Sequence, residues 1–138
     1  MQTRPVKLAL SLLAAGLALA APVCAAEIVV IVSPKNPATR MFSEQASQFF
    51  LGKSSLFTPI ERNDSPLRNE FYQKVLGKDA TQVKAIWSKL VFTGKGNAPK
   101  EYNSDAEVKK AVAADPVAIG YIDKAHVDDT VKVILTVP

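Results

Sequence analysis

The stretch that most constrains the fold is a run of apolar, mostly β-branched residues at positions 27–33, with the sequence EIVVIVS. Every residue from Ile28 to Val32 is apolar, and Ser33-Pro34 closes the run. A continuous apolar run of this length is typical of a strand that is buried on both faces of a sheet. A sheet covered on both faces needs helices on each side, so the run predicts an α/β domain.

Helix starts and stops are marked along the rest of the chain by capping residues, and two of the starts show a capping-box pattern. The expected starts are Ser43, Ser65, Asp79 (with Gln82) and Ser104 (with Glu107), and the expected stops are Gly52, Gly77 and Asp115-Pro116. In the first helix, Phe49 and Phe50 are expected in the core. The helix after Asp79 carries an apolar stripe at helical spacing, which predicts a core-facing side formed by Val83, Ile86, Trp87, Leu90 and Val91.

Three further strands are predicted, at residues 57–62, 118–123 and 130–137. Pro59 places the first of these at a sheet edge or at the start of a strand. Residues 93–99, with the sequence TGKGNAP, are expected to form the most flexible loop. The predicted order is strand, helix, strand, three helices, strand, strand, without an internal repeat.

The N-terminus has the features of a secretory signal peptide. Arg4 and Lys7 precede an apolar run at residues 8–23, and small residues follow as far as Ala26. We therefore expect a signal peptide at residues 1–26, cleaved after Ala25 or Ala26, and one domain at residues 27–138. The apolar run is shorter than the ~20 residues that a membrane span needs. An exported, periplasmic protein that does not span the membrane is predicted.

The single cysteine, Cys24, lies inside this predicted leader. A lipoprotein acylated at Cys24 is the less favoured alternative, because Val23 is bulkier than the residue usual before such a cysteine. Removal of the two basic leader residues lowers the formal net charge from +4 to about +2. A mild excess of this kind, without Lys/Arg runs interleaved with aromatic residues, argues against a nucleic-acid partner.

The residue types that carry catalysis are scarce. His126 is the only histidine, and we expect it to be a solvated loop residue. No G-x-S-x-G motif or mature cysteine exists to pair with it, and one histidine is too few for a zinc site. Gly52-Lys53-Ser54 lacks the upstream glycine of a phosphate loop and follows a helix, so it is discarded. The sequence predicts a non-catalytic protein without metal or cofactor.

Residues 61–71, ERNDSPLRNEF, are the best candidate for a binding site. Ser65 is placed as a helix N-cap, and Arg62, Asp64 and Arg68 crowd the same helix start. Free N–H groups, the helix dipole and guanidinium groups together predict an anion site. Lys95, between two glycines, is a weaker candidate ligand. The alternative is that Arg62 and Asp64 form only a surface ion pair, worth ~0–1 kcal/mol.

Four segments, in the same order and at similar spacing, resemble the second lobe of the phosphate-binding proteins of bacterial phosphate ABC transporters. The matching segments are Phe50-Leu51-Gly52-Lys53, Arg62-Asn63-Asp64-Ser65, Gly94-Lys95-Gly96-Asn97 and Val117-Ala118-Ile119-Gly120-Tyr121. The resemblance implies a single lobe of a type 2 periplasmic binding fold, an α/β architecture with a mixed sheet flanked by helices. It further implies that Arg62 clamps phosphate, Asp64 orients Arg62, and Ser65 donates from its hydroxyl and backbone.

The chain departs from that family at the same place. The family's glycine between the aspartate and the serine is missing, and its Gly-Thr pair after the serine is Pro66-Leu67 here. Proline removes a backbone donor and leucine removes a hydroxyl. Arg68 could compensate, and a second chain could complete the site. Two functions are therefore predicted: an exported phosphate- or oxyanion-binding protein of ABC transport, or a binding-deficient lobe that contacts transporter or sensor proteins of the envelope.

Overall fold

The computed structural model of the protein describes residues 27–138. The predicted signal peptide and Cys24 lie outside the described residues. Strands and helices alternate along the chain as β1 (Ile28–Val32), α1 (Ser43–Phe50), β2 (Thr58–Arg62), α2 (Pro66–Phe71), the π-helical segment η1 (Tyr72–Leu76), α3 (Ala80–Phe92), β3 (Lys100–Tyr102), α4 (Asp105–Ala114), β4 (Ala118–Asp123), the 3-10 turn η2 (Lys124–His126) and β5 (Lys132–Val137). The predicted helix starts and the strands at β1, β2, β4 and β5 are confirmed.

The strands form one mixed sheet in the order β3-β2-β4-β1-β5. β1 is antiparallel to both of its neighbours, β4 and β5, whereas β2 is parallel to β3 and β4. All five residues of β1 are buried, because the strand has a neighbour on each side and is covered on both faces. The α/β class and the mixed sheet flanked by helices are thereby confirmed.

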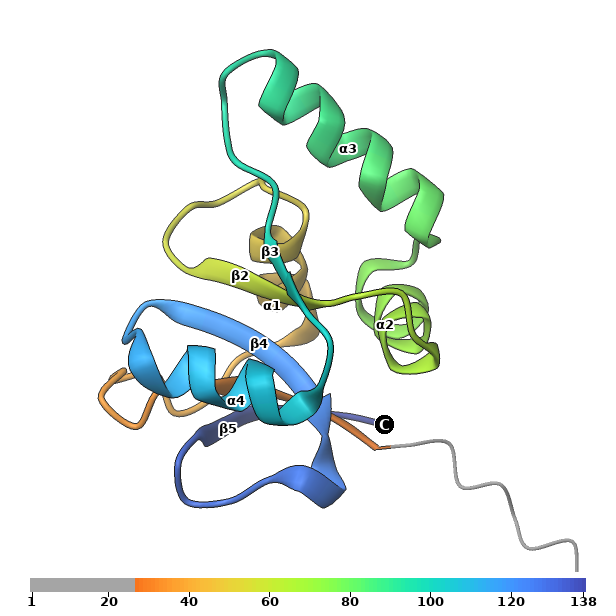
Figure 1. Cartoon of the computed structure of the whole chain (residues 1–138). Helices are drawn as coiled ribbons and strands as arrows, with labels where there is room; N and C mark the ends of the chain where they lie inside the picture. The colour runs from red at the N-terminus through yellow and green to blue at the C-terminus, as the bar shows by residue number, and fades with distance from the viewer. Residues whose placement is uncertain (1–26) are drawn as a thin grey trace, which may run out of the picture.

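Two apolar layers cover the two faces of the sheet (Figure 1). Ile28, Val30 and Val32 of β1 pack with α1, α2 and η1, whereas Val29 and Ile31 pack with α4 on the opposite face. This division follows from the alternation of side chains along a strand. Phe49 and Phe50 lie in the first layer, as predicted.

α3 lies outward from the sheet, and its apolar stripe is only half covered (Figure 1). Val83 is buried, and the partly buried Trp87 donates from Nε1 to the Phe50 carbonyl oxygen at 2.9 Å. Val91, however, is 47% exposed, and the neighbouring Phe92 is 92% exposed. The prediction that the whole stripe faces the core was wrong, because α3 packs on the end of α1 and not along the sheet.

β3 was not predicted. Its three residues, Lys100–Tyr102, form the edge of the sheet and pair in parallel with β2. The sequence KEY is charged and too short to show the alternation typical of a strand. It can therefore be recognised as a strand only from its pairing with β2. In the described part of the chain, no helix is both long and apolar enough to cross a bilayer.

Candidate functional site

The predicted binding segment lies where β2 ends and α2 begins. Ser65 has extended backbone angles, φ −160° and ψ 156°, and its Oγ accepts a hydrogen bond from the Arg68 N–H at 3.2 Å. Pro66 occupies the first helical position, where its missing N–H costs nothing. The predicted N-cap is confirmed, and it fixes the direction in which the chain leaves the sheet.

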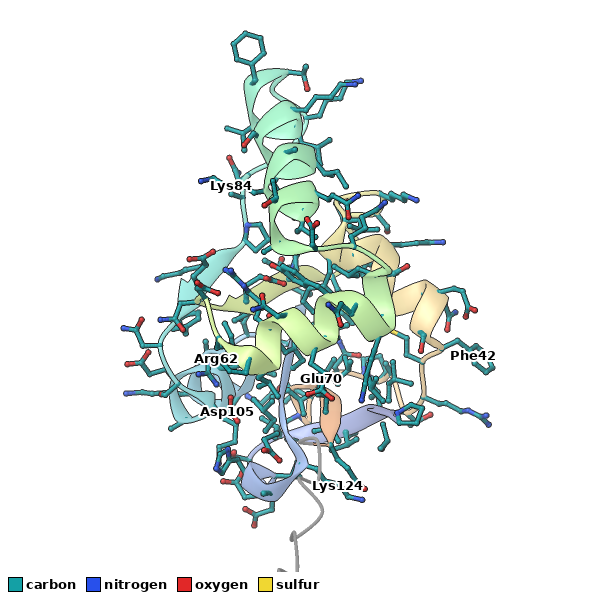
Figure 2. The ribbon with its side chains drawn as sticks, turned by 90° about the vertical axis from the view of Figure 1, so that its right-hand side faces the viewer. Phe42, Arg62, Glu70, Lys84, Asp105 and Lys124 are labelled. Carbon is teal, nitrogen blue, oxygen red and sulfur yellow. The ribbon has the colours of Figure 1, made fainter. Side chains whose placement is uncertain are left out.

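Arg62 does not pair with Asp64. Its guanidinium forms an ion pair with Asp105, at the start of α4, and Nη2 also donates to the Asn103 carbonyl oxygen at 3.3 Å. Figure 2 shows Arg62 and Asp105 side by side. The expected role of Asp64 as the group that orients Arg62 is therefore corrected. Arg62 lies on the α4 face of the sheet, as does Ile60, because alternate strand residues share a face.

Asp105 holds three elements together. Oδ1 of Asp105 accepts a hydrogen bond from Nη1 of Arg62. Oδ2 accepts a hydrogen bond from the Asp123 N–H at 3.0 Å and lies 2.6 Å from Nδ1 of His126. Asp105 is 6% exposed, whereas the His126 side chain is 58% exposed. His126 is thus solvent-accessible, as expected, but it is also a partner of a buried carboxylate. The sequence marked Ser104 as a helix cap but gave no signal that the next residue binds Arg62.

Arg68, and not Arg62, forms the ion pair with Asp64. Its guanidinium lies 3.2 Å from Asp64 and 3.7 Å from Glu101 of β3, and it stacks over the Tyr72 ring at 5.6 Å. Among the described residues, no hydrogen bond or ion pair connects the Lys95 side chain to this segment. Lys95 lies in the loop after α3, where its N–H donates to the Leu90 carbonyl oxygen at 2.9 Å.

Glu61 is a buried carboxyl group that sequence reasoning missed. It is 3% exposed, and its Oε2 accepts hydrogen bonds from the hydroxyls of Tyr72 and, at 3.4 Å, Tyr121. Burial raises the pKa of Glu61 to about 8, so the group is largely protonated at neutral pH. Burial and the adjacent Glu61 raise the pKa of the Tyr72 hydroxyl as well.

The charges at the junction of β2 and α2 are almost balanced. Two guanidinium groups, of Arg62 and Arg68, face three carboxylates, of Asp64, Glu101 and Asp105. The Nε atoms of both arginines are buried and lack a hydrogen-bond partner in the described structure. An anion here would compete with the carboxylates that already hold the guanidinium groups. Residues 27–138 contain no cluster of three or more His, Cys, Asp or Glu side chains that could hold a metal ion.

No protein-family model and no curated protein matches the sequence. Several solved structures do resemble the fold. A protein of Clostridium perfringens, described as a phosphate ABC transporter substrate-binding protein and solved with bound phosphate, has a TM-score of 0.64 and 22% identity. An ABC-type phosphate transport receptor of Vibrio cholerae has a TM-score of 0.62 and 19% identity, and PstS of Borrelia burgdorferi has 0.61 and 15%.

The matched region covers 79% of this chain but only 44%, 45% and 46% of those three structures, respectively. The chain thus spans less than half the length of the proteins it resembles. At these identities the likeness shows the fold: a single lobe of a phosphate-binding-protein-like architecture. The ligand and the residues that contact it stay predictions.

Proposed function

We propose that the protein is an exported, non-catalytic binding protein for phosphate or a similar oxyanion, with low affinity. The observation that carries this proposal is the position of Arg62 and Ser65, at the end of a strand and the start of a helix, in a lobe fold shared with phosphate-binding proteins. The proposal needs neither a cofactor nor nucleic acid. ABC transport of the bound anion is the corresponding role.

Two groups at the junction have a hydrogen-bond donor without a partner in the described structure. The buried Nε–H of Arg62 has no partner, and an unpaired donor of this kind costs ~1–3 kcal/mol unless water or a ligand satisfies it. The Ser65 Oγ accepts the Arg68 N–H, which leaves its own hydroxyl hydrogen free to donate. Pro66 has no backbone N–H, so this helix start offers one backbone donor fewer than it would with another residue at this position.

The affinity follows from a comparison of gains and costs. Two to four charge-assisted hydrogen bonds, at ~1.5–3 kcal/mol each, give ~3–12 kcal/mol. Association costs at least ~4 kcal/mol, and the anion must also displace or share the carboxylate of Asp105. The expected dissociation constant lies in the millimolar range, well above the micromolar value that requires ~8 kcal/mol.

Calorimetric titration of the protein with phosphate and with sulfate tests the proposal. We expect weak, saturable heat that Arg62→Ala abolishes. Lys124→Ala is the control, because Lys124 is an exposed cation that pairs with Glu27 away from the junction. Absence of heat and of any thermal shift at several millimolar of either anion would contradict the proposal.

A second function is favoured by the excess of carboxylates over guanidinium groups at the junction. In this alternative the lobe has lost anion binding and acts as an interaction or sensory accessory of transporter or sensor proteins in the envelope. A related possibility is that two chains together complete one site. A lobe that has lost anion binding should not bind phosphate at any protein concentration. A site completed by two chains should bind phosphate only at protein concentrations at which sedimentation shows a dimer.

A further inference from the structure

The carboxylate that holds Arg62 also contacts a histidine. Oδ1 of Asp105 accepts a hydrogen bond from Nη1 of Arg62, and Oδ2 lies 2.6 Å from Nδ1 of His126. Asp105 therefore lies between Arg62, at the end of β2, and His126, in η2 (Figure 2). A change of charge on His126 acts on Arg62 through this single carboxylate.

The contact between His126 and Asp105 is compatible with both protonation states of the imidazole. A carboxylate oxygen accepts hydrogen bonds, so Nδ1 carries the hydrogen that lies between the two side chains. A second proton then binds at Nε2 and gives the ring a positive charge. The His126 side chain is 58% exposed, so this proton can come from the solvent. Histidine is the residue type whose charge ordinarily changes between pH 5 and 8.

Protonation of His126 changes the net charge around Asp105. With a neutral imidazole, the ion pair of Arg62 and Asp105 has no net charge. With a protonated imidazole, the three side chains together carry one positive charge, which attracts an oxyanion at Arg62. Asp105 is then held by two cations instead of one, so it competes less strongly with the oxyanion for the guanidinium group.

Other charged groups lie on the elements that carry or contact His126, which are α4, β4, η2 and the turn after η2. They are Lys109, Asp123, Lys124, Asp128 and Asp129. Lys109 pairs with Asp128 at 2.7 Å, and Lys124 pairs with Glu27 at 3.0 Å. Aspartate and lysine side chains ordinarily titrate outside the range from pH 5 to 8. Glu61, whose pKa is raised to about 8, lies on the opposite face of β2 and needs its own control.

We propose that His126 is a positioning residue of the oxyanion site and makes the affinity of that site depend on pH. Protonated His126 holds Asp105 and strengthens anion binding at Arg62, whereas neutral His126 adds no charge. The expected gain in affinity from pH 8 to pH 5.5 is about threefold to tenfold, because the charge of the exposed ring is partly screened. This role of His126 rests on the proposed function, since it requires an anion at Arg62.

Calorimetric titration with sulfate at pH 8 and at pH 5.5 measures this dependence. Sulfate keeps two negative charges at both values, whereas phosphate changes its own charge. We expect the wild type to bind sulfate more tightly at pH 5.5. His126→Gln keeps a hydrogen-bond donor but cannot gain a proton, so its affinities at the two pH values should agree within about twofold. Glu61→Gln is the matched control and should keep the gain in affinity.

A second measurement needs no variant. His126 is the only histidine in the chain, so the NMR signals of its ring can be followed against pH in untagged protein. By linkage, an anion that binds the protonated form more tightly also favours that form. The midpoint of the imidazole titration should therefore lie about 0.5–1 pH unit higher in saturating sulfate than in chloride of the same ionic strength.

Three results would overturn the role of His126 while the oxyanion site stands. They are equal affinity of the wild type for sulfate at both pH values, a gain in affinity that persists in His126→Gln, and an imidazole titration that sulfate does not move. Absence of heat with sulfate at both pH values would also overturn this role. Absence of heat with phosphate as well would contradict the oxyanion site itself.

Discussion

The carboxyl group of Glu61 is buried next to the hydroxyls of Tyr72 and Tyr121, with Arg68 and Glu101 as the nearest charges. Its pKa is raised from 4.5 to about 8 in the folded protein. Between these two values the folded state binds one proton more than the unfolded state. The free energy of unfolding should therefore fall as pH rises from about 5 to 8, with a contribution from Glu61 of up to ~1.4 kcal/mol per pH unit.

Glu61→Gln should remove this part of the pH dependence, because the amide does not ionise. Urea denaturation at several pH values from 5 to about 8 measures the effect. Glu70→Gln is the control, because Glu70 pairs with Lys74 on the helix surface. If the unfolding free energies of the wild type and Glu61→Gln change in parallel between pH 5 and about 8, Glu61 is ionised in the folded protein over this range.

The pair formed by Arg62 and Asp105 should be strongly coupled. Their side chains are only 16% and 6% exposed, and loss of one partner leaves the other charge buried. Arg62→Ala or Asp105→Ala alone should cost ~3 kcal/mol of unfolding free energy, and the double variant should cost clearly less than the sum.

A double-mutant cycle in urea measures the coupling of Arg62 with Asp105. The same cycle on Glu70 and Lys74, a surface pair four residues apart, should give only ~0.3–0.5 kcal/mol. If the loss of unfolding free energy in the double variant equals the sum of the losses in Arg62→Ala and Asp105→Ala, this pair does not connect β2 with α4 as proposed.

At the scale of elements, α1 and α3 meet at Gly52. Gly52 has φ +71°, and a Cβ there would lie 2.4 Å from Cδ1 of Leu90 and 3.1 Å from the Trp87 ring. Gly77 has φ +63° and nothing within 4 Å of its Cβ position. Gly77→Ala should therefore cost only the left-handed strain, ~1–2 kcal/mol, and Gly52→Ala should cost more because the side chains of Leu90 and Trp87 must move as well.

Thermal unfolding of both glycine variants, followed by Trp87 fluorescence, tests this contact. Gly52→Ala should also change the emission of the folded state, since Trp87 packs against Gly52. Equal losses of stability for the two variants, with unchanged emission, would contradict a close contact of Gly52 with Leu90 and Trp87.

The elements that could be predicted are those whose signals are local. The apolar run of β1 and the caps at Ser65 and Asp79 depend on neighbouring residues, and the structure confirms them. β3 and the exposed half of α3 depend on which elements happen to lie beside them. The same division applies to the site, where the cap at Ser65 was predictable but the partner of Arg62 was not. Asp105 lies 43 residues further along the chain, and only the fold brings it to Arg62.

At the scale of the whole molecule, residues 27–138 have the fold of one binding-protein lobe, and residues 1–26 are predicted to be removed on export. The intact mass of the protein isolated from the periplasm tests this prediction. We expect a mature chain that begins at Ala26 or Glu27, without acylation. A mass that includes residues 1–25 or a lipid on Cys24 would contradict the predicted cleavage.

We propose that the junction of β2 and α2 binds an oxyanion weakly through Arg62. Calorimetric titration of the wild type, Arg62→Ala and Lys124→Ala with phosphate tests this binding. We expect a millimolar dissociation constant for the wild type and for Lys124→Ala, and no binding by Arg62→Ala. Binding that survives Arg62→Ala, or no binding by any of the three proteins, would contradict the claim.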